Sequence, residues 1–201
     1  MGRDLRSRWD RASRSYDCMV GADAVRFGPA KERLLASLRG RSLMVAVGTG
    51  QDIQHLPAGL WLVGVDISGG MLAHARGPAR AYEGTLPLTQ ADVGLLPFAD
   101  GSFDTVATSC TFCSVPDPIQ GLRELRRILR PDGRLLLFEH VRSRIPPIAL
   151  MQDLMTPLTR RLGPDMNRDT LANAQRAGFR VVREENVYLD IVKAAVAVSA
   201  D

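Results

Sequence analysis

Hydrophobic segments of strand length alternate with segments of helical periodicity along the middle of the chain. The strand segments cover residues 43–47, 60–65, 86–90, 103–109 and 134–138. Helices are expected directly after Gly50, from Ser68 to about Arg76, where Gly77-Pro78 would stop it, and from Pro118 to Leu129. This alternation is typical of a parallel sheet whose strands are joined by right-handed crossovers.

The N-terminal segment has the pattern of an amphipathic helix over residues 4–17. An apolar stripe recurs at helical spacing and arginines fall on the other side: Leu5, Trp9, Ala12 and Tyr16 against Arg3, Arg6, Arg11 and Arg14. Two interpretations stay open. The helix packs its stripe on the domain, or it is a basic amphipathic helix that touches an anionic membrane or closes over a ligand. A second helix is expected over residues 29–38, ending at Gly40.

The C-terminal part departs from the alternating pattern. Four prolines between residues 141 and 167 predict loop and broken helix, followed by a helix over residues 169–177. Residues 179–187 and 191–198 are strand candidates joined too closely for a crossover, so we expect an antiparallel pair. The predicted fold class is α/β, with a doubly wound, mostly parallel seven-stranded sheet and an antiparallel C-terminal strand.

Composition excludes several classes of protein. The 201 residues, 45% of them hydrophobic, suffice for one well-buried domain, and no apolar run reaches the roughly 18 residues of a membrane span. The polar, Arg-rich start shows no secretory signal, and three cysteines without metal-type spacing indicate a reduced cytoplasmic protein with no metal site. The net charge of +4 comes from scattered arginines with only 5% aromatic residues, which argues against nucleic-acid binding.

A glycine turn and two acids follow the first three predicted strands. Gly48-Thr49-Gly50 lets the backbone approach a ligand, and Asp66 can accept hydrogen bonds from two ribose hydroxyls. Asp92, where the third strand should end, can accept from an exocyclic amine of a purine. The third glycine of a dinucleotide site is absent, and Asp52 would repel a pyrophosphate. These features favour a nucleoside ligand that ends in an amino acid, and S-adenosylmethionine fits.

Longer segments carry a resemblance to a known family. The chain resembles a class I S-adenosylmethionine-dependent methyltransferase, of the kind related to the ubiquinone and menaquinone biosynthesis C-methyltransferases (type 11 methyltransferase domain). It also shows some similarity to thiol and phospholipid methyltransferases. The resemblance runs from Leu43 to Val141 through VAVGTGQDIQHLP, VGVDISGGMLAHAR, ADVGLLPFADGSFDTV and CSVPDPIQGLRELRRILRPDGRLLLFEHV. It implies a Rossmann-like fold with a helical cap over residues 1–40, a cofactor-binding core over 41–140, and an acceptor-side lid with the strand pair over 141–201.

The resemblance also implies roles for individual residues. Those assigned to the cofactor are Gly48 and Gly50 at its methionine part, Ser109 and Cys110 beside the sulfonium, Asp66 at the ribose, Ile67 and Met71 flanking the adenine, Asp92 and Val93 at the adenine edge, and Tyr16 closing the pocket. The chain departs from the family pattern at Met44, where an acid is usual, and at Ala46, where glycine is. Asp52 is a candidate substitute for that acid.

Candidates for catalysis follow the fifth strand. His140 is a candidate general base, the alternative being a packed or surface histidine, and Tyr16 is a second candidate at the reacting centre. Glu139 is expected to be structural, and Cys110 and Cys113 to be small buried hydrophobes. The apolar side chains of residues 141–167 suggest a lipophilic acceptor or the ordinary packing of a lid. Four arginines nearby could attract an anionic acceptor or lipid headgroups: Arg144, Arg160, Arg161 and Arg168.

Three functions are compatible with these residues. The first is a cytoplasmic methyltransferase acting on a small, lipophilic molecule. The second performs the same chemistry peripherally at the inner membrane surface, on a quinone precursor or phospholipid headgroup, with the N-terminal helix as the contact. The third is a non-catalytic S-adenosylmethionine-binding partner protein, which Met44 favours. Neither the acceptor atom nor the oligomeric state can be read from the residues.

Overall fold

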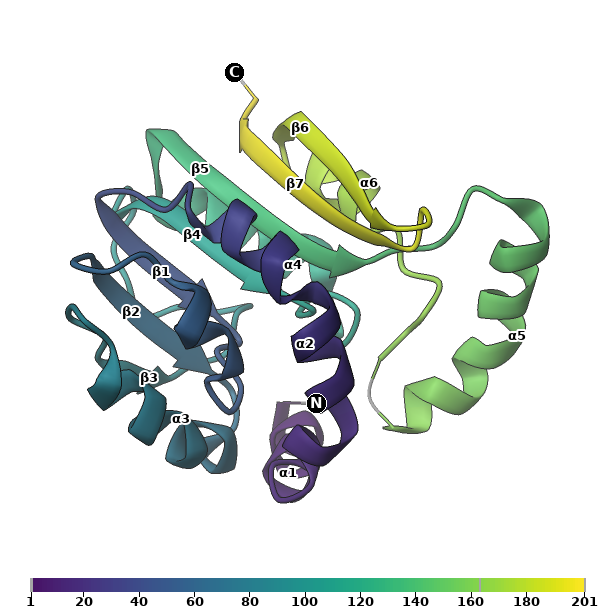
Figure 1. The fold of residues 1–201 in the computed structure, drawn as a ribbon. Helices are drawn as coiled ribbons and strands as arrows, with labels where there is room; N and C mark the ends of the chain where they lie inside the picture. The colour runs from purple at the N-terminus through teal and green to yellow at the C-terminus, as the bar shows by residue number, and fades with distance from the viewer. Residues whose placement is uncertain (1, 163, 201) are drawn as a thin grey trace.

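The described strands form one seven-stranded sheet with helices on both faces (Figure 1). The structure is a computed structural model that describes residues 2–162 and 164–200, without the side chains of residues 2–4, 22, 24, 161 and 162. The strand order is β3-β2-β1-β4-β5-β7-β6. The strands are β1 (Arg41–Val45), β2 (Trp61–Asp66), β3 (Leu88–Gln90), β4 (Phe103–Ser109), β5 (Leu129–His140), β6 (Phe179–Tyr188) and β7 (Val192–Ser199).

The pairing of these strands confirms the predicted fold class. Strands β1 to β5 are parallel to one another, whereas β7 runs antiparallel to both β5 and β6. Val45 at the end of β1 is in register with Val65 in β2 and Thr108 in β4. The loops that leave these three strands therefore open at the same edge of the sheet.

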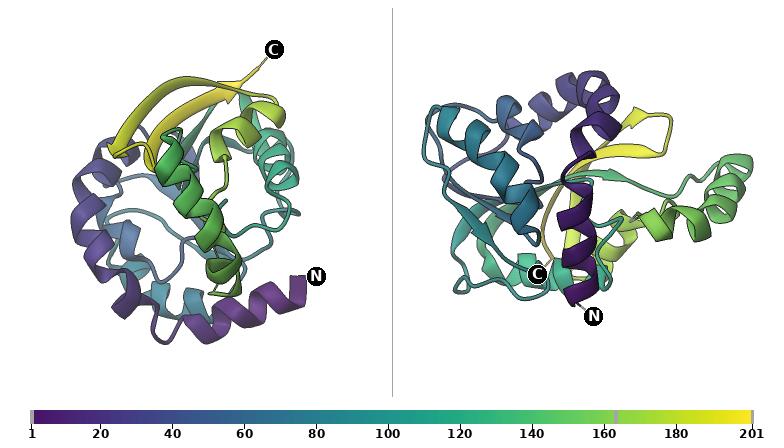
Figure 2. Two further views of the ribbon diagram at one scale, coloured as in Figure 1. Left: turned by 90° about the vertical axis from the view of Figure 1, so that its right-hand side faces the viewer. Right: turned by 90° about the horizontal axis from the view of Figure 1, so that it is seen from below.

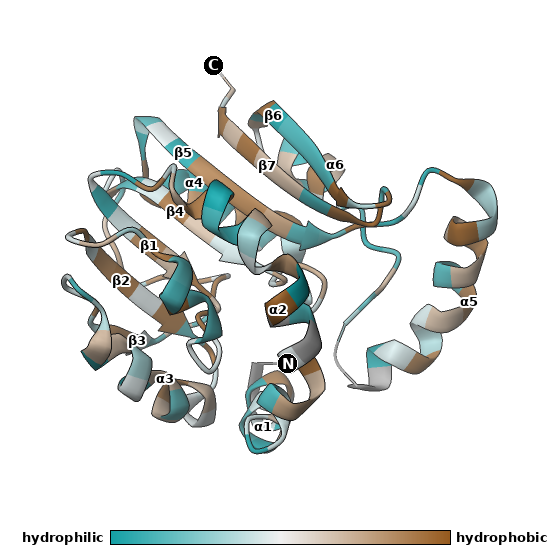
Figure 3. Cartoon of the chain, in the orientation of Figure 1, coloured by the Kyte–Doolittle hydropathy of each residue, from teal (hydrophilic) through white to brown (hydrophobic). Residues whose placement is uncertain are grey.

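The sheet separates the hydrophobic core into two clusters, one on each face. Its central strands are coloured largely as apolar in Figure 3, and helices lie on both sides of them (Figure 1). One face of the sheet packs against α4 (Pro118–Ile128) and α6 (Thr170–Arg176). The other packs against α2 (Tyr16–Leu35), the 3-10 helix η1 (Gln51–His55) and α3 (Gly69–Ala81). Along β5, Leu135 and Leu137 belong to the first cluster and Leu136 to the second. A strand covered on both faces reads as a continuous apolar run, and that is the pattern of residues 135–138.

The N-terminal region differs from the sequence prediction. The single helix over residues 4–17 is in fact α1 (Gly2–Ala12), which ends before a turn, and α2 begins at Tyr16 and runs through the predicted start at Pro29. The Ser13 hydroxyl donates to the Asp10 carbonyl at 2.8 Å, which competes with helix continuation. Pro29 is tolerated because the carbonyl four residues earlier belongs to the exposed Val25, where water can reach it.

Two further helices continue where prolines predicted a stop. Helix α3 passes Gly77-Pro78 and ends at Ala81, with the Pro78 ring packed close to Gly50. Helix α5 (Pro146–Leu162) is unbroken, although loop and broken helix were predicted there. Pro146 and Pro147 occupy its first turn, where no amide donor is needed, and Pro157 is exposed. None of the helices in the described chain has both the length and the apolarity to cross a bilayer.

Candidate functional site

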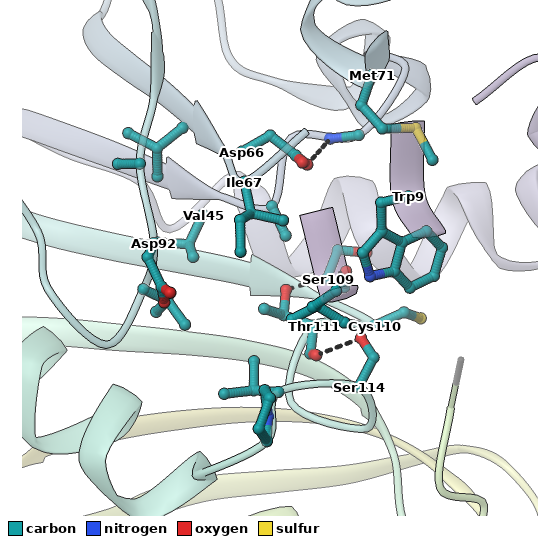
Figure 4. A pocket seen from close by; sticks show the side chains of 18 of the residues that line it. Trp9, Val45, Asp66, Ile67, Met71, Asp92, Ser109, Cys110, Thr111 and Ser114 are labelled. Atoms are coloured by element: carbon teal, nitrogen blue, oxygen red, sulfur yellow. Dashed lines mark hydrogen bonds between the residues drawn. The ribbon is translucent and has the colours of Figure 1, made fainter. Parts of the chain in front are cut away.

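A cavity lies beyond the carboxyl ends of the three central strands (Figure 4). It holds about 720 Å³ of empty space, part of it open to solvent. Its wall comes from the loops after β1, β2, β3 and β4 and from the two N-terminal helices: Leu5, Trp9, Tyr16, Val45, Ala46, Gly48, Val65, Asp66, Ile67, Met71, Ala91, Asp92, Val93, Ser109, Cys110, Thr111, Ser114, Val115 and Pro116.

Asp66 is a fixed, buried carboxylate in this wall. It is 7% exposed, and its two oxygens accept from the backbone N–H groups of Gly48 and Ser68, each at 2.9 Å. Burial raises the pKa of Asp66, and these hydrogen bonds oppose that rise because they stabilise the ionised form. The carboxylate therefore keeps one orientation, with the glycine loop held beside it.

Apolar side chains and a second acid surround one end of the cavity. Ile67, Met71 and Val93 line it, and Asp92 is exposed at its rim. One oxygen of Asp92 accepts from Gly94 N–H at 2.9 Å, which fixes the carboxylate in a tight turn. A planar base fits an apolar slot with a polar rim of this kind, because its faces are apolar and its edge carries hydrogen-bonding groups.

The loop after β4 forms the other end, and Glu139 anchors it from below. Glu139 is buried and accepts three hydrogen bonds, from the Thr108 hydroxyl and from the backbone N–H groups of Thr111 and Phe112 at 2.9–3.1 Å. Burial raises its pKa to about 7, although the hydrogen bonds oppose the rise. The predicted structural role of Glu139 agrees with this position at the base of the loop.

Helices α1 and α2 cover the cavity. The Asp10 carboxylate of α1 accepts from the Ser68 hydroxyl at 2.6 Å and from Gly70 N–H at 3.0 Å, at the start of α3. The Trp9 and Tyr16 rings meet edge to face with centroids 6.1 Å apart. Burial raises the pKa of Tyr16, so its hydroxyl stays protonated at neutral pH. Both aromatic side chains line the cavity beside Leu5.

Asp17 ties the start of α2 to the glycine loop. One oxygen of its carboxylate accepts from the Thr49 hydroxyl at 2.6 Å and from the Gln51 side-chain amide at 2.8 Å. The contact places Tyr16, the preceding residue, over the cavity. The sequence segment WDRASRSYD thus supplies two aromatic cavity residues and two carboxylates that fasten their helices.

Comparison with known proteins identifies the domain. Residues 43–137 match the family described as methyltransferase domain. The chain contains a methyltransferase domain. The demethylmenaquinone methyltransferase of Mycolicibacterium vanbaalenii is 37% identical over 142 residues, which are 68% of this chain and 60% of that relative. The ubiquinone/menaquinone biosynthesis C-methyltransferase UbiE of Geotalea daltonii is 34% identical over 116 residues, which are 55% of this chain and 49% of it.

The solved structures show the same fold. An S-adenosylmethionine-dependent methyltransferase from Thermotoga maritima superposes with a TM-score of 0.72 at 20% identity, covering 97% of this chain and 99% of that one. The chain spans about half to three fifths of the curated relatives named above. The methyltransferase domain and its fold are thus common to these proteins and this chain.

Most residues assigned to the cofactor from sequence line the cavity of the methyltransferase domain. Nine of them are in its wall: Tyr16, Gly48, Asp66, Ile67, Met71, Asp92, Val93, Ser109 and Cys110. Gly50 is not. It has φ +89°, and a side chain there would come within 3.1–3.2 Å of Ala75, Ile53 and Pro78. Gly50 is needed for the close packing of α3 on the loop, and its predicted ligand contact stays a prediction.

Two other predicted residues lie outside the cavity wall. His140 is half-buried with Nδ1 3.5 Å from the Cys110 sulfur, and burial lowers its pKa. Asp52 forms an ion pair with Lys31 at 2.7 Å, so its carboxylate already has a cationic partner. Burial raises the pKa of the Cys110 thiol well above its ordinary value and that of Cys113 to about 12, so both stay neutral.

The structure also supplies residues that sequence reasoning missed. Asp10, Thr111 and Ser114 take part in the site, and Leu5 and Trp9 form its cover. The apolar stripe of the N-terminal segment indicated that Leu5 and Trp9 face the domain, but their place over the cavity depends on the turn between α1 and α2. The segment predicted to cover the acceptor side does not line this cavity, because no described residue from 141 to 167 is in its wall. The side chain of Arg161, like that of Arg3, lies outside the described residues.

The two departures from the family pattern have different consequences. Met44 is buried in the hydrophobic cluster under α2 and is not in the cavity wall. Ala46 has φ +53°, a left-handed conformation that costs a residue with a Cβ about 1–2 kcal/mol and costs glycine nothing.

We therefore expect Ala46→Gly to raise the free energy of unfolding by about 0.5–1 kcal/mol, after the added freedom of glycine in the unfolded chain is subtracted. Urea denaturation followed by circular dichroism measures the change. Ala107→Gly, at a buried position of β4 without positive φ, is the matched control and should destabilise. Equal destabilisation by both variants would contradict strain at Ala46.

Proposed function

We propose that this protein transfers a methyl group from S-adenosylmethionine to a small, apolar acceptor of the quinone-precursor class. The observation that carries the proposal is the buried Asp66 carboxylate, held by Gly48 N–H in a cavity at the strand ends of a methyltransferase domain. In this proposal residues 1–40 form the cap and residues 41–140 form the cofactor-binding core. The protein acts in the cytoplasm.

The chemistry of the cavity wall fits this cofactor from end to end. Asp66 offers acceptors for a ribose diol, and Ile67, Met71 and Val93 offer an apolar slot for adenine with Asp92 at its edge. When bound, S-adenosylmethionine supplies an electrophilic methyl group. Gly48 lies in the wall beside the loop of β4, and a Cβ built on it would meet only Ala46 O at 3.9 Å, so the loop leaves room for an amino-acid end.

The residues of the chain act by positioning and by excluding water. The titratable side chains in the described wall are Tyr16, Asp66, Asp92 and Cys110, and the candidate base His140 is behind Cys110. A protonated Tyr16 hydroxyl can donate a hydrogen bond to an acceptor oxygen. Alignment of the methyl donor and the acceptor in a water-poor site can supply much of the acceleration of the displacement. Because His140 is not in the cavity wall, the proposal requires an acceptor that is already nucleophilic, as an ionised hydroquinone is.

The acceptor class rests on the apolar cover and on the relatives. Leu5, Trp9, Val115 and Pro116 border the cavity near the β4 loop, and these side chains suit a flat, apolar molecule. The relatives named above carry names of quinone-biosynthesis methyltransferases. A non-catalytic S-adenosylmethionine-binding partner protein is the second candidate, favoured by the lack of His140 in the cavity wall and by Met44.

Binding and turnover separate these candidates. Calorimetric titration with S-adenosylhomocysteine should show saturable binding, and incubation with S-adenosylmethionine and a reduced demethylated naphthoquinone should yield the methylated ring by mass spectrometry. Lack of binding at millimolar ligand would contradict the cofactor. Binding without product would contradict the quinone acceptor and favour the second candidate.

A further inference from the structure

Helix α5 presents its large apolar side chains to solvent. Leu150, Met151, Leu154, Met155 and Leu158 are 59%, 55%, 72%, 42% and 55% exposed. Between residues 145 and 158 every exposed position is Ile, Pro, Leu or Met. The helix stands at the edge of the molecule, away from the sheet (Figure 1). The other large exposed hydrophobic side chains of the described chain are spread over several elements, so α5 is where they cluster.

The polar face of α5 is the buried one. Gln152 is 3% exposed, its amide oxygen accepts from Ser143 N–H, and its amide nitrogen donates to the carbonyls of Val141 and Met166. Thr156 and Ala149 are buried on the same side. At 100° per residue, the exposed Leu and Met positions centre on the opposite side of the helix. This reverses the usual amphipathic arrangement, so the outer face is adapted to an apolar environment.

Arginines border this outer face. Arg144 and Arg160 are exposed at the two ends of α5. The guanidinium of Arg8 donates to the carbonyl of Arg160 at 3.2 Å, so α1 adjoins the C-terminal end of α5 (Figure 2). Helix α1 and the turn after it expose three more arginines: Arg6, Arg11 and Arg14. Asp153, the acid within α5, is held by Arg142 and Asn167 and is not on the outer face.

We propose that the outer face of α5, defined by Leu150, Met151, Leu154, Met155 and Leu158, docks on an anionic lipid bilayer. An apolar helix face bordered by arginines matches the boundary between acyl chains and negatively charged headgroups. The charge argues for this occupant over a second copy, because pairing α5 with α5 would bring the bordering arginines of both copies together. The proposal concerns α5 and does not depend on the proposed enzymatic function.

Flotation with lipid vesicles tests the proposal on the full chain. The wild type should float with vesicles of phosphatidylcholine and phosphatidylglycerol, and more weakly with phosphatidylcholine alone. The variant Leu150→Gln/Leu154→Gln/Leu158→Gln should lose at least about tenfold in vesicle affinity, since three leucine side chains no longer enter the bilayer. Val25→Gln/Leu95→Gln, at exposed positions elsewhere, is the matched control and should float like the wild type.

Further measurements decide the occupant. Arg6→Gln/Arg11→Gln should weaken flotation only on the anionic vesicles, because those side chains contribute through charge. Circular dichroism checks that each variant keeps its fold. Failure of the wild type to float, or equal flotation by the triple leucine variant, would overturn the proposal. A wild-type dimer by light scattering that the leucine variant converts to monomer, without flotation, would assign the face to a second copy instead.

Discussion

Replacing Asp66 by alanine is expected to weaken S-adenosylhomocysteine binding at least tenfold, about 1.4 kcal/mol. The carboxylate is the buried acceptor at the end of β2, and its removal leaves the ribose hydroxyls without that partner. The N–H groups of Gly48 and Ser68 also lose their acceptor, so the loop that borders the ligand is released. Calorimetric titration measures the affinity.

Two controls separate binding from folding. Asp66→Asn retains a carbonyl oxygen for one of the two N–H groups, so it should be more stable than the alanine variant while still binding weakly. Urea denaturation gives the stability of both. An affinity equal to that of the wild type in a folded Asp66→Ala protein would show that the ribose assignment is wrong.

The second large effect is expected at Glu139. Glu139→Ala removes the acceptor of the Thr111 and Phe112 N–H groups, and each buried unpaired donor costs about 1–3 kcal/mol. We therefore expect the free energy of unfolding to fall by about 2–6 kcal/mol, measured by urea denaturation near pH 4.5, where the contribution of Glu139 is complete. A loss below 0.5 kcal/mol, taken here as a rough threshold for an ordinary surface substitution, would contradict the anchoring role.

The pH dependence gives an independent test of the same residue. The pKa of Glu139 is raised in the folded protein to about 7 from 4.5, so the folded state binds its proton more tightly than the unfolded state. Its contribution to stability is complete below about pH 4.5 and is lost as the pH rises to about 7, a change of about 3 kcal/mol. Glu139→Gln cannot titrate, so the stability difference between wild type and this variant should follow that change. A pH-independent difference would contradict the raised pKa.

The strands were predictable because both faces of the sheet are covered. The continuous apolar run of residues 135–138 reads directly as part of β5, and the closely spaced final runs read as an antiparallel pair. The helix ends were harder to predict. Pro78 suggested a stop, but its ring packs near Gly50, and a tertiary contact of this kind cannot be seen in local sequence.

The site was predictable where a residue follows a strand directly. Asp66, Asp92 and Cys110 are fixed by the strand before them, and all three line the cavity. His140 is itself the last residue of a strand, but Cys110 of the loop after β4 lies against its ring. Asp10 gave no signal, because its partners Ser68 and Gly70 are about sixty residues away in sequence. Side-chain pairs at such separations depend on how the helices pack.

Ser68 contacts both the floor of the cavity and the helix that covers it. Its backbone N–H binds Asp66 in the floor of the cavity, and its hydroxyl binds Asp10 on the covering helix. A ligand that holds Asp66 in place also holds Ser68, and so favours the position in which α1 is latched. This coupling is reciprocal: the free energy by which the bound ligand stabilises the closed position of α1 equals the free energy by which closure of α1 strengthens ligand binding. Affinity for the ligand and the equilibrium position of the N-terminal helix are then two measurements of one coupling free energy.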